Sequence, residues 1–325
     1  MFQDTRANLD ATVAKFRNSA LAKSTKRTYR TYLLAYVKFC TLMRILLMPI
    51  SPQNLGRFVA YLSCKLSFNS IANYLSIVRY IHLQAGYHNP LDTVYAQNII
   101  KGAKRVLGVR TYSKLPITPL LLSKLHSVLD FTLSLDITFW AACLVAFFSF
   151  FRKSNLFAPS TRLFDQDRHL AQNNISFSSS GALIKVSWSK TIQFNQRALQ
   201  IPLPHIPNSK FCPCCILKLT LTLHTPQSPG PCSAFLFREG QQLKLLTYNL
   251  FLSKIKSSLR QVGVDPSAYS GHSFRRGGAS FALECGLSPV MIKSQGDWAS
   301  DAYQLYIDPS LSHRLQVASK LGEEF

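Results

Sequence analysis

The chain has 325 residues, and its 37 Lys and Arg against 15 Asp and Glu give a formal net charge of +22 at pH 7. So large a positive excess predicts binding to a polyanion, because Lys and Arg contacts to phosphates release condensed counterions. The length allows two domains, each with its own hydrophobic core. So few acidic residues disfavour a nuclease that depends on a cluster of carboxylates and two metal ions.

The apolar segments predict no membrane span. The longest apolar run, residues 139–151, is interrupted by Ser149 and is short for crossing a bilayer. The first residues, MFQDTRANLDATVAKF, lack the apolar centre of a signal peptide. We therefore expect a soluble intracellular protein without a membrane partner, whose eight cysteines stay reduced.

The first third of the sequence predicts helices only. Apolar residues recur on one helix face over 24–40, and Ser51-Pro52 predicts a second helix that ends near residue 66. Two further helices are expected at 69–86 and 92–108, each ending at a glycine. Residues 1–113 hold 16 Lys and Arg against 3 Asp and Glu, a net of +13, whereas the other 212 residues carry +9.

This charge distribution predicts that residues 1–108 form a helical DNA-binding domain; the alternative is a solvated basic face that binds nothing. The residues expected to contact DNA are Lys26, Arg27, Arg30, Lys101, Lys104 and Arg105.

The remainder of the chain predicts a second domain, 117–325, after a polar linker at 109–116. Thr118-Pro119 begins a helix, and the strongly apolar residues 135–151 form another that is central to the core. Alternating residues over 174–203 predict two or three short antiparallel strands. Further helices are expected at about 214–223, 247–262, 272–285, 288–294, 300–306 and 310–321. The predicted fold class is mainly α with a small antiparallel β-sheet.

The segment 271–306 carries the most informative chemistry. His272 and Arg275 form an H-x-x-R pair, followed by Trp298 and Tyr306. Each of these residues alone is a weak signal for function, because polar pairs three residues apart on a helix and half-buried tyrosines are both common. Together they suit phosphodiester cleavage without a metal: a tyrosine attacks, an arginine holds the phosphate charge, and His and Trp donate hydrogen bonds around the phosphorus.

Two elements upstream fit the same chemistry. Arg152 directly follows the apolar helix, where it is either a cap of the helix dipole or a phosphate ligand. Lys190 falls in WSKT at the turn of the predicted hairpin, where it is either an ordinary exposed lysine or a proton donor. Lys185 is the alternative candidate for this role, but because it lies within a predicted strand, its side chain is less able to reach the DNA.

The segments FFRKSNL, WSKT, SGHSFRRGGASFAL and GDWASDAYQLY, in this order, resemble the tyrosine recombinase (phage integrase) family. They look most like recombinases of eukaryotic DIRS-like, Ngaro and Crypton mobile elements. The resemblance implies an N-terminal SAM-like core-binding domain, an α+β catalytic domain at 117–325, and site-specific recombination of double-stranded DNA through a 3′-phosphotyrosine without metal or cofactor. The catalytic residues it implies are Arg152, Lys190, His272, Arg275, Trp298 and the nucleophile Tyr306.

The sequence departs from the family pattern at one position and offers a second candidate nucleophile. Many relatives carry an acidic residue where this chain has Asn155. Tyr303 is a rival nucleophile, although Tyr306-Ile307 fits the family pattern better. The resemblance also implies a homo-tetramer on DNA that exchanges the C-terminal helix 310–321, and a location in the nucleus. The alternatives are a catalytically inactive DNA-binding protein derived from such a recombinase and a type IB topoisomerase.

The cysteines of FCPCC, residues 211–215, permit a zinc hypothesis. Cys212, Cys214 and Cys215 would need Cys232, His205 or His224 to complete a site. The favoured interpretation is a loop that packs small apolar sulfurs, with no metal bound.

Overall fold

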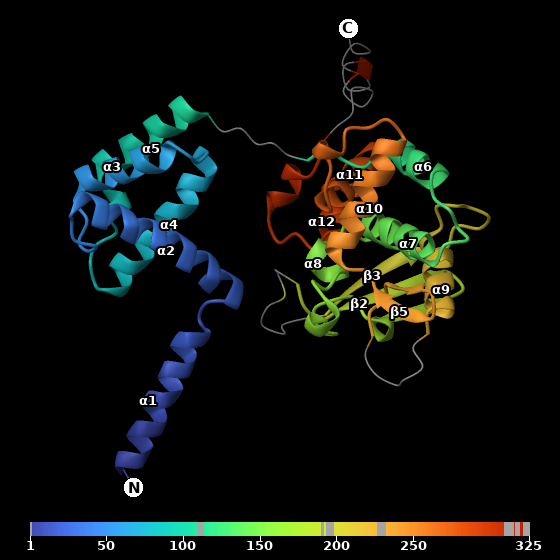
Figure 1. The fold of residues 1–325 in the computed structure, drawn as a ribbon, viewed down its shortest axis with the longest axis horizontal. Helices are drawn as coiled ribbons and strands as arrows, with labels where there is room; N and C mark the ends of the chain where they lie inside the picture. Colours follow the sequence, from blue (N-terminus) through green and yellow to red (C-terminus); the bar gives the residue numbers. More distant parts are fainter. Residues whose placement is uncertain are drawn as a thin grey trace. The chain divides into compact units, whose positions relative to one another are not determined.

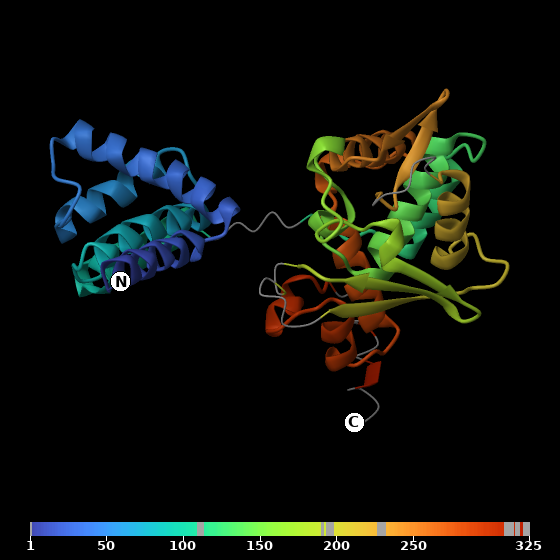
Figure 2. The same cartoon turned by 90° about the horizontal axis from the view of Figure 1, so that it is seen from below.

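The computed structural model describes residues 2–108, 114–189, 192, 198–225, 232–308, 315 and 319–320. The chain divides into two compact units, Met1–Tyr112 and Ser113–Phe325, whose elements are drawn in Figures 1 and 2. Lys190, the predicted linker residues 109–113 and most of the predicted helix 310–321 lie outside the described residues. Among the described helices, none combines the length and apolarity needed to cross a membrane.

The first unit is helical throughout its described part. Its helices are α1 (Phe2–Ser19), α2 (Lys23–Met43), α3 (Pro52–Ser63), α4 (Phe68–Gln84), the short η1 (Pro90–Asp92) and α5 (Val94–Leu107).

The helices α2 to α5 surround one core, in which Tyr36, Phe39 and Phe58 are packed ring against ring. Local capping sets two of the boundaries, because the Ser51 and Thr93 side chains accept hydrogen bonds from backbone N–H groups in the first turns of α3 and α5. The described side chains of α1 are exposed, including the apolar Leu9, Val13 and Phe16, which recur at helical spacing.

The second unit combines helices with two small antiparallel sheets. Its elements are α6 (Pro119–Ser127), α7 (Ser134–Ser149), α8 (Lys153–Leu156), η2 (Thr161–Leu163), η3 (Gln172–Asn174), β1 (Ile175–Ser178), β2 (Gly181–Val186), β3 (Leu199–Pro204), α9 (Pro213–Leu223), β4 (Leu236–Glu239), β5 (Gln242–Leu245), α10 (Tyr248–Gln261), η4 (Pro266–Ala268), α11 (His272–Glu284), α12 (Pro289–Gln295) and η5 (Asp301–Leu305).

The apolar helix α7 is the centre of this unit. It contacts α9, α11, β3 and β4, and 13 of its 16 residues are buried. A helix that is apolar on all faces can be stable only when neighbours cover every face. The three-stranded sheet has the order β1-β2-β3, and Ile184 of β2 pairs with Ile201 of β3. These core-facing residues place the sheet against α7, as Figure 1 shows.

The mainly α fold with a small antiparallel sheet is therefore as predicted, with three differences. Helix α1 and the hairpin β4–β5 were not anticipated. Residues 300–306 were expected to form an α-helix, but residues 301–305 form the 3₁₀ helix η5 instead. Residues 114–116 belong to the second unit rather than to a free linker, since the Leu115 N–H donates to the Ala268 carbonyl oxygen at 2.8 Å.

Candidate active site

Arg275 is the centre of the candidate site. It lies on α11, and only 1% of its surface is exposed. Its guanidinium donates to the carbonyl oxygens of Phe150 and Gly296, the latter at 2.8 Å. Its Nε is buried and has no hydrogen-bond partner among the described residues. Two backbone carbonyls thus hold the planar fork in one orientation and leave donor capacity unused.

The surroundings of Arg275 favour an incoming anion. Burial and the charge of Arg152 lower the pKa of Arg275 to about 9, while Tyr306 and Asp297 act in the opposite direction. The group therefore stays positively charged at pH 7. A desolvated guanidinium beside a second one gains strongly from a phosphate, because charge-assisted bidentate bonds are among the strongest hydrogen bonds in proteins.

Arg152 reaches the same place from the end of α7. Phe150 ends that helix in the left-handed conformation, with φ of 53°, and the chain turns so that Arg152 becomes the residue before α8. Arg152 and Arg275 line one small hollow, together with Asp297. The structure therefore brings together the two arginines that the sequence singled out separately.

His272 is the first residue of α11, one turn before Arg275. Desolvation lowers the pKa of His272 below its ordinary value of 6.5, and the positive charges of Lys153, Arg275 and Arg152 lower it further. At neutral pH the imidazole is therefore uncharged and can accept a proton. The H-x-x-R spacing has placed it beside both arginines.

Trp298 and Tyr306 close the other side of Arg275. The guanidinium carbon lies 3.7 Å from the Trp298 ring centre and 5.0 Å from that of Tyr306. The two aromatic rings are themselves 5.3 Å apart. Trp298 is buried, and its indole N–H has no hydrogen-bond partner in the part of the chain that is described. A buried indole donor that is not satisfied costs free energy, which a bound acceptor would recover.

The two candidate tyrosines differ in their surroundings. Tyr303 is 7% exposed and packs into a small core with Trp298 and Ile292. Tyr306 lies at the end of η5, is only partly buried, and its ring centre lies 5.0 Å from the Arg275 guanidinium carbon. The arrangement gives Tyr303 a packing environment and leaves Tyr306 beside the arginine.

Lys190 lies outside the described residues, but the residues just before it are tied to the site. Asn155 Nδ2 donates to the Trp188 carbonyl oxygen at 3.0 Å. The Ser189 hydroxyl donates to Asp297 Oδ2 at 3.0 Å. The chain that leads to Lys190 is thus fixed both to α8 and to the turn before Trp298.

Three residues of the site were missed by the sequence analysis. Asp297 is buried in the left-handed conformation, with φ of 51°, and provides the carboxylate beside Arg275. Arg276 donates to the Leu305 carbonyl oxygen at 2.7 Å and pairs with Asp308 at 3.3 Å. Ser280 accepts from the Asp308 N–H at 2.8 Å. The Arg-Arg doublet was a usable signal for Arg276, whereas nothing local marked Asp297 or Ser280.

The DNA contacts predicted in the first unit are all exposed cations. Lys26, Arg27 and Arg30 lie on α2. Lys101, Lys104 and Arg105 lie on α5. Both helices therefore present basic side chains to solvent.

A second cluster with ligand chemistry lies away from Arg275. His205, Cys212 and Cys215 come together after the end of β3, with one ligand atom from each within 4.8 Å of the others. Of the FCPCC cysteines, Cys212 and Cys214 are buried in the main core, as the packing interpretation expects, whereas Cys215 is exposed. Cys214 and Cys215 lie in α9 rather than in a loop.

Comparison with known proteins bears on both units. Residues 16–85 match the family described as phage integrase, N-terminal SAM-like domain. An integrase/recombinase xerD homolog from Selenomonas ruminantium is 23% identical over 283 residues, which cover 84% of this chain and 78% of the relative.

Two solved structures share the architecture. The Tn1549 transposon integrase in complex with transposon right end DNA has a TM-score of 0.63 at 14% identity, covering 95% of this chain and 98% of that one. The XerH site-specific recombinase bound to palindromic difH substrate has a TM-score of 0.61 at 16% identity, covering 91% and 79%. This chain therefore has the tyrosine recombinase fold, in which a SAM-like helical unit precedes the catalytic fold.

Proposed function

We propose that this protein is a tyrosine recombinase that binds double-stranded DNA and cuts and rejoins its strands. The observation that carries the proposal is the arrangement around Arg275, where a second arginine, a histidine, an indole N–H and a tyrosine converge. The relatives support it, since similar structures were determined as an integrase with transposon end DNA and a recombinase with its difH substrate.

In the proposed mechanism the Tyr306 oxygen attacks a backbone phosphorus, the bond to the 5′-oxygen breaks, and a 3′-phosphotyrosine forms. Arg152 and Arg275 hold the non-bridging oxygens, on which negative charge grows in the transition state. Both cations are in place before the DNA arrives, so little reorganisation is needed. Loss of either guanidinium is expected to slow cleavage by roughly 10²- to 10³-fold.

The remaining roles concern protons and hydrogen bonds. His272, uncharged at neutral pH, accepts the proton from the tyrosine hydroxyl. The buried indole N–H of Trp298 donates to a phosphate oxygen. Lys190 protonates the leaving 5′-oxygen. No step needs a cofactor, because the phosphodiester energy is kept in the phosphotyrosine bond until a 5′-hydroxyl attacks it.

We further propose the biological setting that the resemblance implies. The protein serves the site-specific integration or transposition of a mobile element, with affinity to the eukaryotic DIRS-like, Ngaro and Crypton groups. It acts in the nucleus as a homo-tetramer on two DNA duplexes, and its C-terminal helix is exchanged between neighbouring protomers.

The decisive experiment compares two tyrosine variants. The purified protein is incubated with negatively supercoiled plasmid in EDTA, quenched with SDS, and examined for protein-linked DNA. Wild type and Tyr303→Phe are expected to form the covalent adduct, because Tyr303 is a packing residue whose ring is kept. Tyr306→Phe keeps its ring against Arg275 but has no nucleophile, so it should bind DNA without linkage. An adduct with Tyr306→Phe would refute the assignment.

A second candidate function is favoured by one residue. Asn155 stands where relatives carry an acid, which fits a DNA-binding protein that has lost its activity. In this chain Asn155 still anchors the Trp188 carbonyl, and a carboxylate enters the site from Asp297 instead. If wild type binds its natural element ends tightly but forms no adduct on them, the binding-only function is the correct one.

A further inference from the structure

The cluster His205, Cys212 and Cys215 takes no part in the proposed DNA chemistry. Leu199, at one end of β3, lines the hollow beside Arg275, while His205 directly follows the other end of this six-residue strand. At about 3.3 Å per residue, the two ends are roughly 17 Å apart. The cluster therefore needs its own explanation.

The start of α9 places the thiols of Cys212 and Cys215 side by side. Cys212 and Cys215 have the C-x₂-C spacing, with Cys212 as the N-cap of α9 and Pro213 in its first turn. The Cys212 sulfur accepts the backbone N–H of Ile206 at 3.2 Å and that of Cys215 at 3.3 Å. It also lies 3.0 Å from the Cys215 sulfur.

These contacts favour a thiolate at Cys212. Its sulfur lies within hydrogen-bond distance of the Cys215 thiol and of the backbone N–H groups of Ile206 and Cys215. Backbone N–H groups directed at a sulfur stabilise negative charge there in the same way as they do around metal-bound cysteines. A thiolate is the form of cysteine that binds a metal.

We propose that His205, Cys212 and Cys215 form a structural binding site for a zinc ion, with a water molecule or a further side chain as fourth ligand. Two sulfurs and one imidazole nitrogen are a ligand set that favours Zn²⁺ over hard cations such as Mg²⁺ or Ca²⁺. Tetrahedral zinc–sulfur bonds would place the two sulfurs roughly 3.7 Å apart, so the pair must open slightly from its present separation. Cys215 and His205 are exposed and can make this adjustment.

A redox dithiol is the competing use of a C-x₂-C pair at a helix start. An exchange reaction needs an accessible thiolate as nucleophile. Here Cys212, the sulfur that accepts two backbone N–H groups, is only 2% exposed. The exposed thiol is Cys215, which lies within hydrogen-bond distance of the Cys212 sulfur. The sulfur that the backbone stabilises as a thiolate is thus the inaccessible one, which favours metal binding over thiol exchange.

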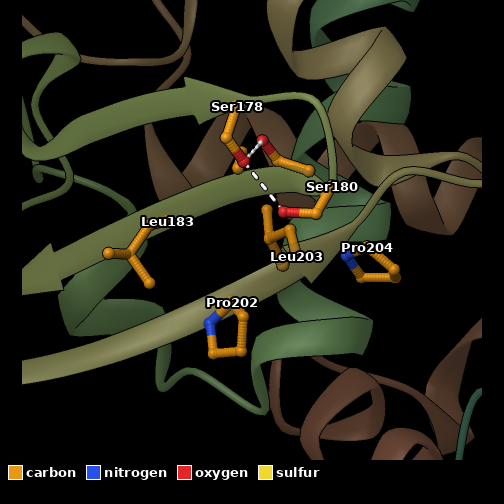
Figure 3. Close-up of a pocket in the computed structure, with 8 residues that line it drawn as sticks. Ser178, Ser180, Leu183, Pro202, Leu203 and Pro204 are labelled. Carbon is orange, nitrogen blue, oxygen red and sulfur yellow. Dashed lines mark hydrogen bonds between the residues drawn. The ribbon is translucent and has the colours of Figure 1, made fainter.

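Zinc at this position would fasten the base of the hairpin that leads to Lys190. The His205 N–H donates to the Ser180 carbonyl oxygen at 3.1 Å, and β3 pairs with β2 along its length. Figure 3 shows this end of the sheet, where Pro202 to Pro204 run beside the turn at Ser178–Ser180. The segment 205–212, between β3 and α9, is held to α7, since Trp140 Nε1 donates to the Lys210 carbonyl oxygen at 2.9 Å.

The test uses the full chain, reduced and freed of metal, without DNA. Zinc is titrated against a chromophoric chelator, and cobalt is titrated as a spectroscopic probe. We expect one ion per chain, thiolate-to-cobalt charge-transfer and tetrahedral d–d absorption, and a higher melting temperature with zinc. Cys215→Ser and His205→Ala alter exposed residues, so they should fold and should bind zinc at least about 100-fold more weakly.

Matched controls are Cys285→Ser and Cys64→Ser, which remove exposed thiols elsewhere and should leave binding and spectra unchanged. Absence of a thiolate band in wild type, or equal zinc affinity in Cys215→Ser and wild type, would overturn the proposal. So would a Cys212–Cys215 disulfide that forms readily in air while zinc is present, because it would assign the pair to redox chemistry.

Discussion

At the scale of single residues, the main feature is Arg275, a buried arginine whose guanidinium donates to two backbone carbonyl oxygens. Leaving water costs the Arg275 guanidinium several kcal/mol, and neutral carbonyls recover only part of it. A phosphate bound to the Arg275 guanidinium would therefore recover free energy that is lost in the free protein. Trp298 adds an unsatisfied buried N–H to the same place. These unused donors are in place to bind a negatively charged group.

The protonation of His272 gives a prediction at this scale. Its pKa in the free protein is expected below 6.5, because desolvation and three nearby cations disfavour the charged ring. Since the neutral form is the one that accepts a proton, the capacity to act as a base is lost only as the pH falls through this lowered pKa. NMR titration of the His272 ring should show this midpoint, and Arg152→Gln should raise it by removing one cation.

His126 serves as the internal control for that titration. Its pKa is also lowered, but by burial and by Lys210, so Arg152→Gln should leave it unchanged. A His272 midpoint at or above 6.5, or one that ignores Arg152→Gln, would mean that the cations do not act on the ring as described.

At the scale of elements, close packing of α11 explains the Gly277-Gly278 pair. A Cβ at Gly277 would meet the Ile117 carbonyl oxygen at 1.8 Å, and one at Gly278 would meet the Phe147 carbonyl oxygen at 2.2 Å. Helix α11 can therefore approach α7 closely enough for Arg275 to reach the carbonyl of Phe150. The two glycines thus set the position of the arginine fork.

The hairpin β2–β3 gives a prediction for an element. Ser189→Ala removes the 3.0 Å bond to Asp297 and loosens the chain just before Lys190. A hydrogen bond to a charged group is worth about 1.5–3 kcal/mol, so cleavage should slow by on the order of tenfold or more. DNA affinity should not change. Single-turnover cleavage and equilibrium binding on the same DNA provide the two readouts.

Ser187→Ala is the matched control for the hairpin. Ser187 directly follows β2, two residues before Ser189, and among the described residues it forms no hydrogen bond with Asp297. Equal slowing in both variants would indicate a general loss of hairpin structure. Unchanged cleavage in Ser189→Ala would show that the tether does not position Lys190.

The predicted elements differ in how well local signals describe them. Helices α3, α6 and α7 lie close to their predicted positions. Their signals are local: a cap at Ser51-Pro52, a cap at Thr118-Pro119, and an uninterrupted apolar run in α7. The hairpin β4–β5 was missed although Gly240, with φ of 60°, marks its turn, because strands of four residues show too little alternation. Helix η5 is short, and its packing rather than its periodicity determines its form.

At the scale of the whole molecule, the charge of +22 predicts how binding depends on salt. The logarithm of DNA affinity should fall linearly with the logarithm of salt concentration, with a slope of about 0.9 per phosphate contact. Replacing exposed Arg27 and Arg30 of α2 with Ala should reduce the slope by roughly 2. Fluorescence anisotropy at several salt concentrations measures it.

Lys124→Ala with Lys218→Ala removes two exposed cations from α6 and α9 and should change the slope less. A flat salt response in wild type would contradict phosphate contact altogether. Equal slopes for the two double variants would show that net charge, rather than α2, drives binding.

From the sequence alone we could predict the class of the fold, the basic character of the first unit and the residue types of the candidate site. These depend on composition, short-range periodicity and capping, all of which act within a few residues. Three features depend on the tertiary structure. Arg275 donates a hydrogen bond to the carbonyl of Phe150, 125 residues away, and the Asp297 carboxylate lies beside Arg275. His205 lies close to Cys212 and Cys215. Such contacts depend on the path of the whole chain around α7, which no local pattern specifies.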